Sequence, residues 1–142
     1  MLFRSSFFVP GVPQPQGSSR AFTTKTGRAY VTSANAKLKP WREAVRAEAF
    51  RAAIGQSMMT NPVAAQYEFI FLRPKSRKKF LYPSVRPDLD KLVRAVNDAL
   101  TDAGVIKDDA LIVRLHANKL YTTDPAKVGV SIQVEEWEDD EK

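Results

Sequence analysis

An amphipathic segment from Leu89 to Ala103 constrains the fold of this chain more than any other feature. Its apolar residues recur at steps of three and four along one face: Leu89, Leu92, Val93, Val96, Ala99, Leu100 and Ala103. Pro87 disfavours helical backbone at the residue before it, and Gly104 follows the last apolar residue. The segment therefore predicts a helix that begins near Asp88, ends near Gly104 and packs one face against a core.

Around this helix the sequence predicts strands and one further helix. We expect strands where apolar, β-branched and aromatic residues are bounded by turn residues, and a helix where Trp41, Val45 and Ala49 recur at helical spacing. The expected strands cover 7–9, 63–72, 111–121 and 127–137, a hairpin pairs 21–22 with 29–31 around a turn at 24–28, and the second helix runs from about residue 39 to 54. The prediction is a single α+β domain over residues 1–142, a mixed sheet of about four to five strands packed with two main helices.

The residue types present exclude several kinds of site. There is no cysteine, which excludes disulfides, thiolate metal sites and a cysteine nucleophile. The single histidine, His116, excludes a histidine-rich zinc site, and its place in a strand opposite Val113 and Leu115 predicts a surface position. Any metal would be held by oxygen, which favours Mg²⁺, with Mn²⁺ as a substitute. No apolar run approaches the length of a membrane span, so we expect a cytoplasmic protein with no membrane partner.

Positive charge is concentrated in the body of the chain. The net charge is +6, but residues 135–142 hold six acids and one base and form an acidic tail, so the other 134 residues carry +11. A basic body of this kind is typical of a protein that binds polyphosphate, the alternative being a merely soluble basic domain. The densest part, residues 73–86, is interpreted as a flexible basic loop that follows the DNA backbone. The candidate DNA contacts are Arg20, Arg73, Lys75, Arg77, Lys78, Lys79, Arg86, Lys91 and Lys119.

Phe80 and Tyr82 interrupt this basic loop. They could stack on unpaired bases, an interaction worth about 1–3 kcal/mol per base, or they could pin the loop to the core. Phosphate contacts by the loop would make binding depend on salt, with about five contacts on duplex DNA giving a slope near −4.5 in log affinity against log salt.

Acidic residues bracket the predicted helix at both ends. Asp88 and Asp90 lie at its start, and Asp108 and Asp109 follow its end. Two such charges about 4 Å apart repel by roughly 4 kcal/mol at an effective dielectric of 20, so a divalent cation would offset the cost if the acids converge. The alternative for the first pair is structural, because acids at a helix start cap it and favour its dipole. In a basic chain, the pattern favours a metal-dependent nuclease centre facing phosphate.

Arg94 lies one turn from Asp90 and one turn from Asp98 on the polar face of the predicted helix. Two interpretations of this arginine are open. It could form ordinary helix ion pairs with the two aspartates, worth a few tenths of a kcal/mol each. Alternatively, it could point at the scissile phosphate and stabilise the charge that develops there.

The length of the helix separates the two acidic groups. A helix of some 15 residues is about 22 Å long, and residues 104–108 span only about 17 Å when fully extended. Asp109 therefore reaches Asp88 and Asp90 only if the connection doubles back, or if a second subunit supplies it. Both possibilities are open, and the second predicts a site shared between subunits.

The segment from Arg86 to Asp109, which reads RPDLDKLVRAVNDALTDAGVIKDD, resembles the RusA-type Holliday junction endonucleases. A weaker similarity covers 10–20 and 27–30, so the resemblance spans most of the chain. It implies a homodimer that binds branched DNA and nicks two opposed strands of a four-way junction symmetrically with Mg²⁺. It also implies that three acids bind the metal and are essential for catalysis: Asp88, Asp90 and Asp109.

Two positions depart from the pattern of that family. Lys91 stands where the family usually has asparagine, and Arg94 stands where the family has its catalytic lysine. Arginine keeps the positive charge and can bind phosphate through two hydrogen bonds, but it donates a proton less readily than lysine. The departure therefore favours electrostatic stabilisation over acid chemistry at Arg94.

Together these features predict a Mg²⁺-dependent, structure-selective endonuclease of DNA recombination and repair, a crossover junction endodeoxyribonuclease that acts by paired symmetric nicks. Asp88, Asp90 and Asp109 would hold the metal, and Arg94 would neutralise charge on the phosphate. Two rival interpretations are a metal-dependent nuclease that acts on flap or duplex DNA, and a non-catalytic DNA-binding module whose acids are caps and surface pairs.

Overall fold

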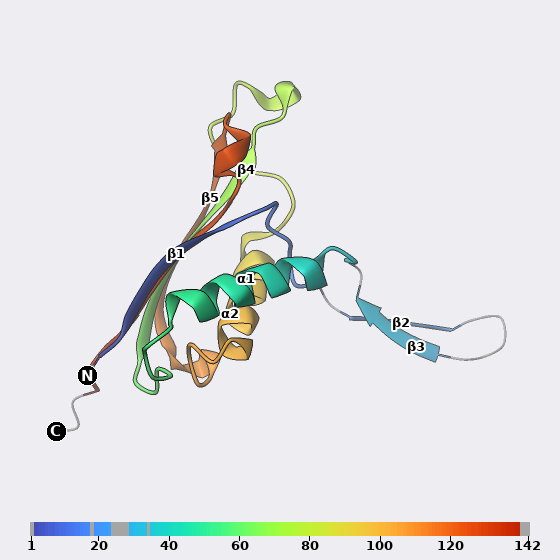
Figure 1. Ribbon diagram of the computed structural model, residues 1–142. Helices are drawn as coiled ribbons and strands as arrows, with labels where there is room; N and C mark the ends of the chain where they lie inside the picture. Colours follow the sequence, from blue (N-terminus) through green and yellow to red (C-terminus); the bar gives the residue numbers. More distant parts are fainter. Residues whose placement is uncertain (1, 18, 24–28, 34, 140–142) are drawn as a thin grey trace.

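The computed structural model describes residues 2–17, 19–23, 29–33 and 35–139, with the backbone alone for 19–23 and 29–33. In this part of the chain, one mixed sheet carries two helices on one face, and a separate hairpin extends beyond them (Figure 1). The sheet contains β1 (Arg4–Pro10), β4 (Val63–Leu72), β5 (Ile112–Thr122) and β6 (Gly129–Glu136). The helices are α1 (Leu38–Ala52) and α2 (Leu89–Asp102), and the hairpin pairs β2 (Ser19–Thr23) with β3 (Ala29–Ser33). The predicted α+β fold is confirmed; the predicted turn at 24–28 lies outside the described residues.

The strand order in the sheet is β1-β6-β4-β5. β6 is antiparallel to both of its neighbours, whereas β4 and β5 are parallel. β5 is the last strand in this order and lies at an edge of the sheet. Parallel neighbours need a crossover, and α2 supplies it between β4 and β5. Asp124 and Pro125, residue types typical of turns, lead into a short 3₁₀ turn (Pro125–Lys127). This connection carries the chain past β4 and does not pair β5 directly with β6.

The hydrophobic core lies between the sheet and the two helices. The buried strand residues alternate along β4 and β6 and are Val63, Ala65, Tyr67, Phe69, Val130, Ile132 and Val134. The buried helix residues are Leu38, Trp41, Val45 and Ala49 of α1, and Leu92, Val93, Ala95, Val96, Ala99 and Leu100 of α2. The apolar stripe of the 89–103 segment is thus confirmed as the buried face of α2. Gly104, with φ of +74°, ends the helix in the left-handed conformation that glycine adopts easily.

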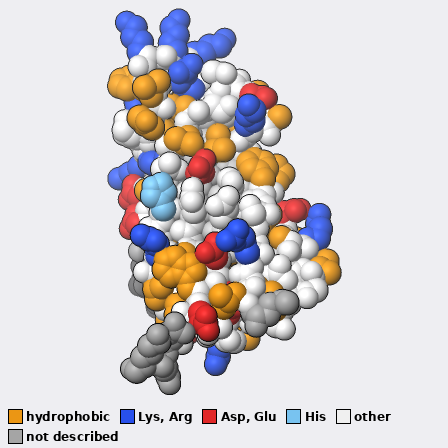
Figure 2. Space-filling view, turned by 90° about the vertical axis from the view of Figure 1, so that its left-hand side faces the viewer, with side chains coloured by type: hydrophobic (Ala, Val, Ile, Leu, Met, Phe, Trp, Pro, Cys, Tyr) orange, Lys and Arg blue, Asp and Glu red, His pale blue; other side chains and the backbone are white. Residues whose placement is uncertain are grey.

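In the part of the chain that the structure describes, the opposite face of the sheet carries no helix, and Figure 2 shows this face with its exposed charged and polar side chains. His116 pairs in register with Gln66 of β4 and is exposed on this face, so the predicted surface position of the histidine is confirmed. Within the described ranges, no helix has the length and apolar character that a membrane span requires.

The acidic tail predicted at 135–142 starts two residues too early, because its first two residues lie in the strand that is expected at 127–137. Glu135 and Glu136 belong to β6, where Glu135 pairs in register with Arg4 of β1. Glu136 is buried, with 4% of its surface exposed. Its Oε2 accepts hydrogen bonds from the Thr60 and Asn61 backbone amides and from Asn61 Nδ2, at 2.9, 3.1 and 3.0 Å, and its Oε1 accepts one from the Phe3 amide at 3.2 Å. This carboxylate therefore joins the N-terminal segment to the residues that lead into β4.

We expect Glu136→Gln to lower the free energy of unfolding by about 1–3 kcal/mol at neutral pH. The NH₂ group of the glutamine would face an N–H donor, so neither group would have an acceptor there. Burial alone would raise the pKa of Glu136, but the hydrogen bonds from Thr60, Asn61 and Phe3 outweigh it and hold the pKa below its usual range. A lowered pKa in the folded state stabilises the protein above the unfolded-state pKa, and this contribution is lost as pH falls through the folded-state pKa.

Urea unfolding at neutral and acidic pH measures this effect, and the difference between wild type and Glu136→Gln should shrink on acidification. Glu135→Gln is the matched control. Glu135 is half-exposed and forms a surface ion pair with Arg4, so its loss should cost no more than about 1 kcal/mol. Equal destabilisation by both variants would contradict the role assigned to Glu136.

Candidate metal and DNA-binding site

Asp88 and Asp90 lie at the exposed N-terminal end of α2. Asp88 occupies the N-cap position with extended backbone, but its side chain makes no capping hydrogen bond. Instead its Oδ2 lies 3.6 Å from Nζ of Lys91, in a half-exposed pair. Asp90 follows in the first turn and is also exposed. The predicted N-cap position of Asp88 is confirmed, but its carboxylate makes no capping hydrogen bond, and both carboxylates face solvent where a ligand can reach them.

Arg94 lies one turn further along α2 and is exposed. Among the residues that the structure describes, it forms an ion pair with neither Asp90 nor Asp98, although both lie at the required spacing. The ion-pair interpretation is thus not realised in this conformation. A guanidinium without a carboxylate partner on an exposed helix face is available to bind an anion from outside.

Asp108 and Asp109 form a separate acidic pair after α2. Asp109 begins a 3₁₀ turn (Asp109–Leu111), and Oδ1 of Asp108 accepts a hydrogen bond from the Ala110 amide at 2.8 Å. This bond and a hydrogen bond to Asp109 lower the pKa of Asp108. The hydrogen bond that protonated Asp109 donates to Asp108, slight burial, and the negative charges of Asp108 and Asp98 raise the pKa of Asp109. The two carboxyl groups therefore lie close enough for each to shift the pKa of the other.

The neighbours of Asp109 place it beside the C-terminal half of α2. The charge of Asp98 acts on Asp109, and burial followed by the charge of Asp109 raises the pKa of Tyr67. The Tyr67 hydroxyl in turn donates to Oδ1 of Asn97 at 2.7 Å. Asp98 follows Asp90 by eight residues, which is a rise of about 12 Å along a helix. Within one protomer, Asp109 thus lies beside Asp98 rather than beside Asp88 and Asp90.

The predicted grouping of three aspartates is not formed within the described part of a single chain. No three His, Cys, Asp or Glu side chains in that part lie close enough together to hold a metal ion. The chain does double back, but only after Asp109, because β5 returns along α2 toward the N-terminal end of that helix. The residue that reaches the start of α2 is therefore Lys119, and the metal site itself stays a prediction.

Lys119 has a structural role that its sequence position does not reveal. Its Nζ donates hydrogen bonds to the carbonyls of Val85 and Pro87, at 2.8 and 2.9 Å. These bonds hold the segment before Asp88 against β5. The predicted DNA contact by Lys119 stays a prediction, but its ammonium group is already engaged by two carbonyl groups.

The basic loop at 73–86 projects past the end of the sheet (Figure 1), and its Lys and Arg side chains gather at one end of the molecule in Figure 2. Inside the loop, Nη2 of Arg77 donates to Oγ of Ser84 at 3.1 Å, and its guanidinium lies 4.1 Å from the Phe80 ring centroid. Phe80 and Tyr82 are 50% and 61% exposed. These aromatics do not pin the loop to the core, so that alternative is wrong. Both rings remain accessible for stacking.

The other predicted DNA contacts lie around these elements. The exposed ones are Lys75, Lys78, Lys79, Arg86 and Lys91, while Arg73 is partly buried. The side chain of Arg20 lies outside the described residues. Contact of any of these cations with DNA stays a prediction, but Arg86 and Lys91 flank the start of α2, and the three exposed lysines lie in the loop before it.

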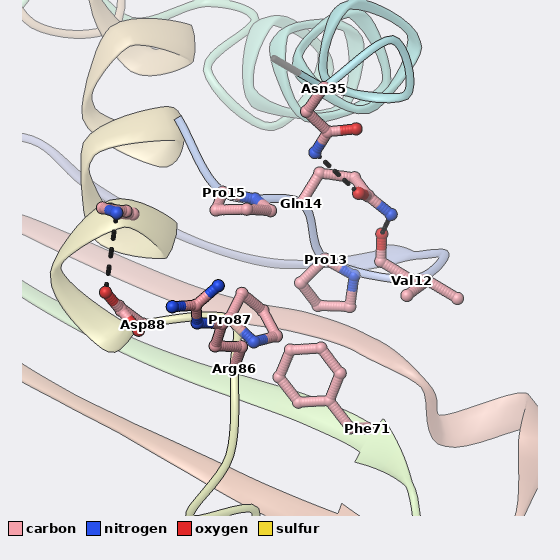
Figure 3. A pocket seen from close by; sticks show the side chains of 10 residues that line it. Val12, Pro13, Gln14, Pro15, Asn35, Phe71, Arg86, Pro87 and Asp88 are labelled. Atoms are coloured by element: carbon pink, nitrogen blue, oxygen red, sulfur yellow. Dashed lines mark hydrogen bonds and ion pairs between the residues drawn. The ribbon is translucent and has the colours of Figure 1, made fainter. Parts of the chain in front are cut away.

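A cavity of about 570 Å³ opens beside Asp88, and sequence reasoning missed it (Figure 3). It is lined by Val12, Pro13, Gln14, Pro15, Asn35, Phe71, Arg86, Pro87, Asp88 and Lys91. Residues 10–20 are rich in proline, glutamine, glycine and serine, a composition that by itself predicts only an extended loop. Nothing in that composition indicates that the loop lies against Asp88, because the contact joins segments more than 50 residues apart.

Comparison with known proteins identifies a relative and a family for this chain. The chain is 29% identical over 130 residues to the uncharacterized protein YqaN of Bacillus subtilis (strain 168), an alignment that covers 84% of this chain and 89% of that protein. The family model for endodeoxyribonuclease RusA matches residues 10–135, which include both acidic pairs, α2 and the basic loop. The chain therefore belongs to the RusA endodeoxyribonuclease family.

Proposed function

We propose that this protein is a Mg²⁺-dependent endonuclease that resolves four-way DNA junctions by paired symmetric nicks, acting as a homodimer. The observation that supports this most directly is the start of α2, where Asp88 and Asp90 are exposed, the Asp88 side chain makes no capping hydrogen bond, and Arg94 has no carboxylate partner among the described residues. Exposed acids beside an unpaired arginine, in a chain of a nuclease family, are suited to hold a cation against phosphate.

The donor set of this site fits Mg²⁺. Asp88, Asp90 and Asp109 offer only carboxylate oxygens, the ligands that Mg²⁺ prefers, and Mn²⁺ accepts the same set. When bound, the metal supplies Lewis-acid stabilisation of the phosphate and an activated water. Asp88 and Asp90 would hold and orient the ion, and the guanidinium of Arg94 would bind a non-bridging phosphate oxygen and offset the charge that develops on it.

We propose further that the Asp109 of each site comes from the partner subunit. The support is the position of Asp109 beside Asp98, about 12 Å along α2 from Asp90 by helical rise. A two-fold axis that brings two α2 helices together side by side and antiparallel would set the Asp109 of each chain against the Asp88 and Asp90 of the other. The exposed apolar residues next to Asp109, Val113 and Leu115, would be covered by the same contact.

Arg94 can be tested apart from the metal ligands. We expect Arg94→Ala to reduce the single-turnover cleavage rate by about 100- to 1,000-fold while changing junction affinity little, because charge stabilisation is lost mainly in the transition state. Arg94→Lys keeps the positive charge and should restore most of the rate. Arg46→Ala, on the exposed face of α1 where Arg46 pairs with Glu43, is the control that should cleave normally. Equal rates for Arg94→Ala and wild type would remove Arg94 from the mechanism.

A synthetic four-way junction with each arm labelled tests the function as a whole. With Mg²⁺ or Mn²⁺, wild-type protein should produce paired nicks at symmetric positions in opposed strands, and a chelator should abolish them. Flap and duplex DNA of the same sequence should be cut far more slowly. Faster cleavage of flap or duplex DNA would establish the first rival function, and tight binding with no cleavage in any metal would establish the second.

A further inference from the structure

The cavity beside Asp88 has the walls of a binding site for a flat ring. The side chains of Pro13, Pro87 and Phe71 come from three different segments and converge on it in Figure 3, and Gln14 closes another side. Its volume of about 570 Å³ lies within the range of about 300–1,000 Å³ that is usual for small-ligand sites.

The cavity is held open by hydrogen bonds at both ends of the loop that forms it. The Gly11 amide donates to the Val128 carbonyl at 3.1 Å, and the Gln16 amide donates to the Lys91 carbonyl at 2.9 Å. Pro13 between them is buried. A proline-rich loop fixed at both ends loses little conformational freedom when a ligand binds, so the cavity is organised before binding.

Gln14 presents polar groups to this cavity. Its Oε1 accepts a hydrogen bond from Nδ2 of Asn35 at 3.0 Å, and its Nε2 donates one to the Val12 carbonyl at 3.2 Å. These bonds fix the orientation of the amide. Each uses only part of its capacity, since an amide oxygen has a second lone pair and an NH₂ group a second hydrogen. An oriented donor and acceptor side by side can recognise the edge of a base.

The rim of the cavity is cationic and joins the candidate cleavage site. Arg86 and Lys91 line it together with Asp88, so a ligand inside would place its charged group between two cations and one proposed metal ligand. An anion attached to a flat ring matches this arrangement, and a nucleotide within a DNA strand has that chemistry.

We propose that this cavity takes the base of an unpaired nucleotide next to the scissile phosphate, with Gln14 reading the base. This inference rests on the proposed function and deepens it. A base must leave the duplex stack to enter, which costs least where it is already unpaired, as at a branch point. The cavity thus makes cleavage depend both on branched structure and on the identity of one base.

Four junctions that differ only in the base flanking the cleavage position test this proposal. Wild type should favour one base over the worst by about 5- to 150-fold in cleavage rate, the range expected for one well-oriented pair of hydrogen bonds. Gln14→Ala should flatten this preference. Gln14→Glu replaces a donor with an acceptor and should shift the preference toward cytosine, which offers an amino group. Gln133→Ala, exposed on the open face of the sheet, is the control that should keep the wild-type preference.

Affinity for the same four junctions, measured by gel shift without metal, separates this proposal from the proposed function. A base preference in affinity that disappears in Gln14→Ala would support the base site even if no junction is cut. Cleavage whose base preference is unchanged by both Gln14 variants would overturn the base site and leave the nuclease assignment intact. A wild-type protein indifferent to the flanking base in both assays would also overturn it.

Discussion

Asparagine in place of Asp90 is expected to reduce cleavage of a four-way junction by at least about 100-fold while leaving junction binding intact. The loss of supporting partners around a metal ligand already costs about 10- to 100-fold, and Asp90 is proposed to be a ligand itself. Asp90 is exposed and makes no hydrogen bond or ion pair within the described residues, so its removal should not disturb α2. Binding should be retained, because the substitution removes a negative charge from a surface that faces phosphate.

Asp102→Asn is the matched control for this substitution. Asp102 is the last residue of the same helix, and its carboxylate pairs with Arg42 at 2.8 Å on the far side from the basic loop. Its loss should cost less than about 1 kcal/mol of stability and leave cleavage unchanged. Junction cleavage by labelled arms and binding by gel shift measure both variants. Cleavage by Asp90→Asn at the wild-type rate would remove Asp90 from the mechanism.

A dimer with one Asp90→Asn subunit and one Asp109→Asn subunit is expected to regain cleavage at one of its two sites. If Asp109 acts across the interface, one site combines both substituted residues, while the other combines the intact Asp90 of one chain with the intact Asp109 of its partner. Each variant alone should be inactive. The mixed dimer, isolated by two affinity tags on co-expressed chains, should therefore nick single strands rather than opposed pairs.

A second mixed dimer gives the opposite result and serves as the control. Wild type combined with an Asp90→Asn, Asp109→Asn double variant has no intact site if Asp109 acts across the interface, although one subunit carries no substitution. If each chain instead supplies all of its own ligands, this dimer keeps one active site and the first mixed dimer has none. The two mixtures together decide between the arrangements, whichever way the rates fall.

The local elements of this fold were predictable because their signals are local. The apolar period of 89–103 predicted the buried face of α2, and strand 63–72 coincides with β4. The order of strands was not predictable, because β6 lies between β1 and β4. These strands are far apart in the sequence, and no local pattern indicates that they pair. Glu136 shows the same limit. Its position in a run of acids indicated solvent, whereas donors from three distant residues hold it in the interior.

The candidate site likewise combines features that the sequence predicts with relations that only the folded chain reveals. The sequence by itself determined which residues carry charge, that α2 separates two acidic groups, and which family the motif resembles, because composition, period and spacing are properties of the chain alone. Only the tertiary structure decided that the Asp88 side chain makes no capping hydrogen bond, that Lys119 rather than Asp109 returns to the start of α2, and that Gln14 lies beside the acids. The reason is physical: these relations depend on which distant segments pack together, and packing follows from burying the whole apolar surface at once rather than from any one segment.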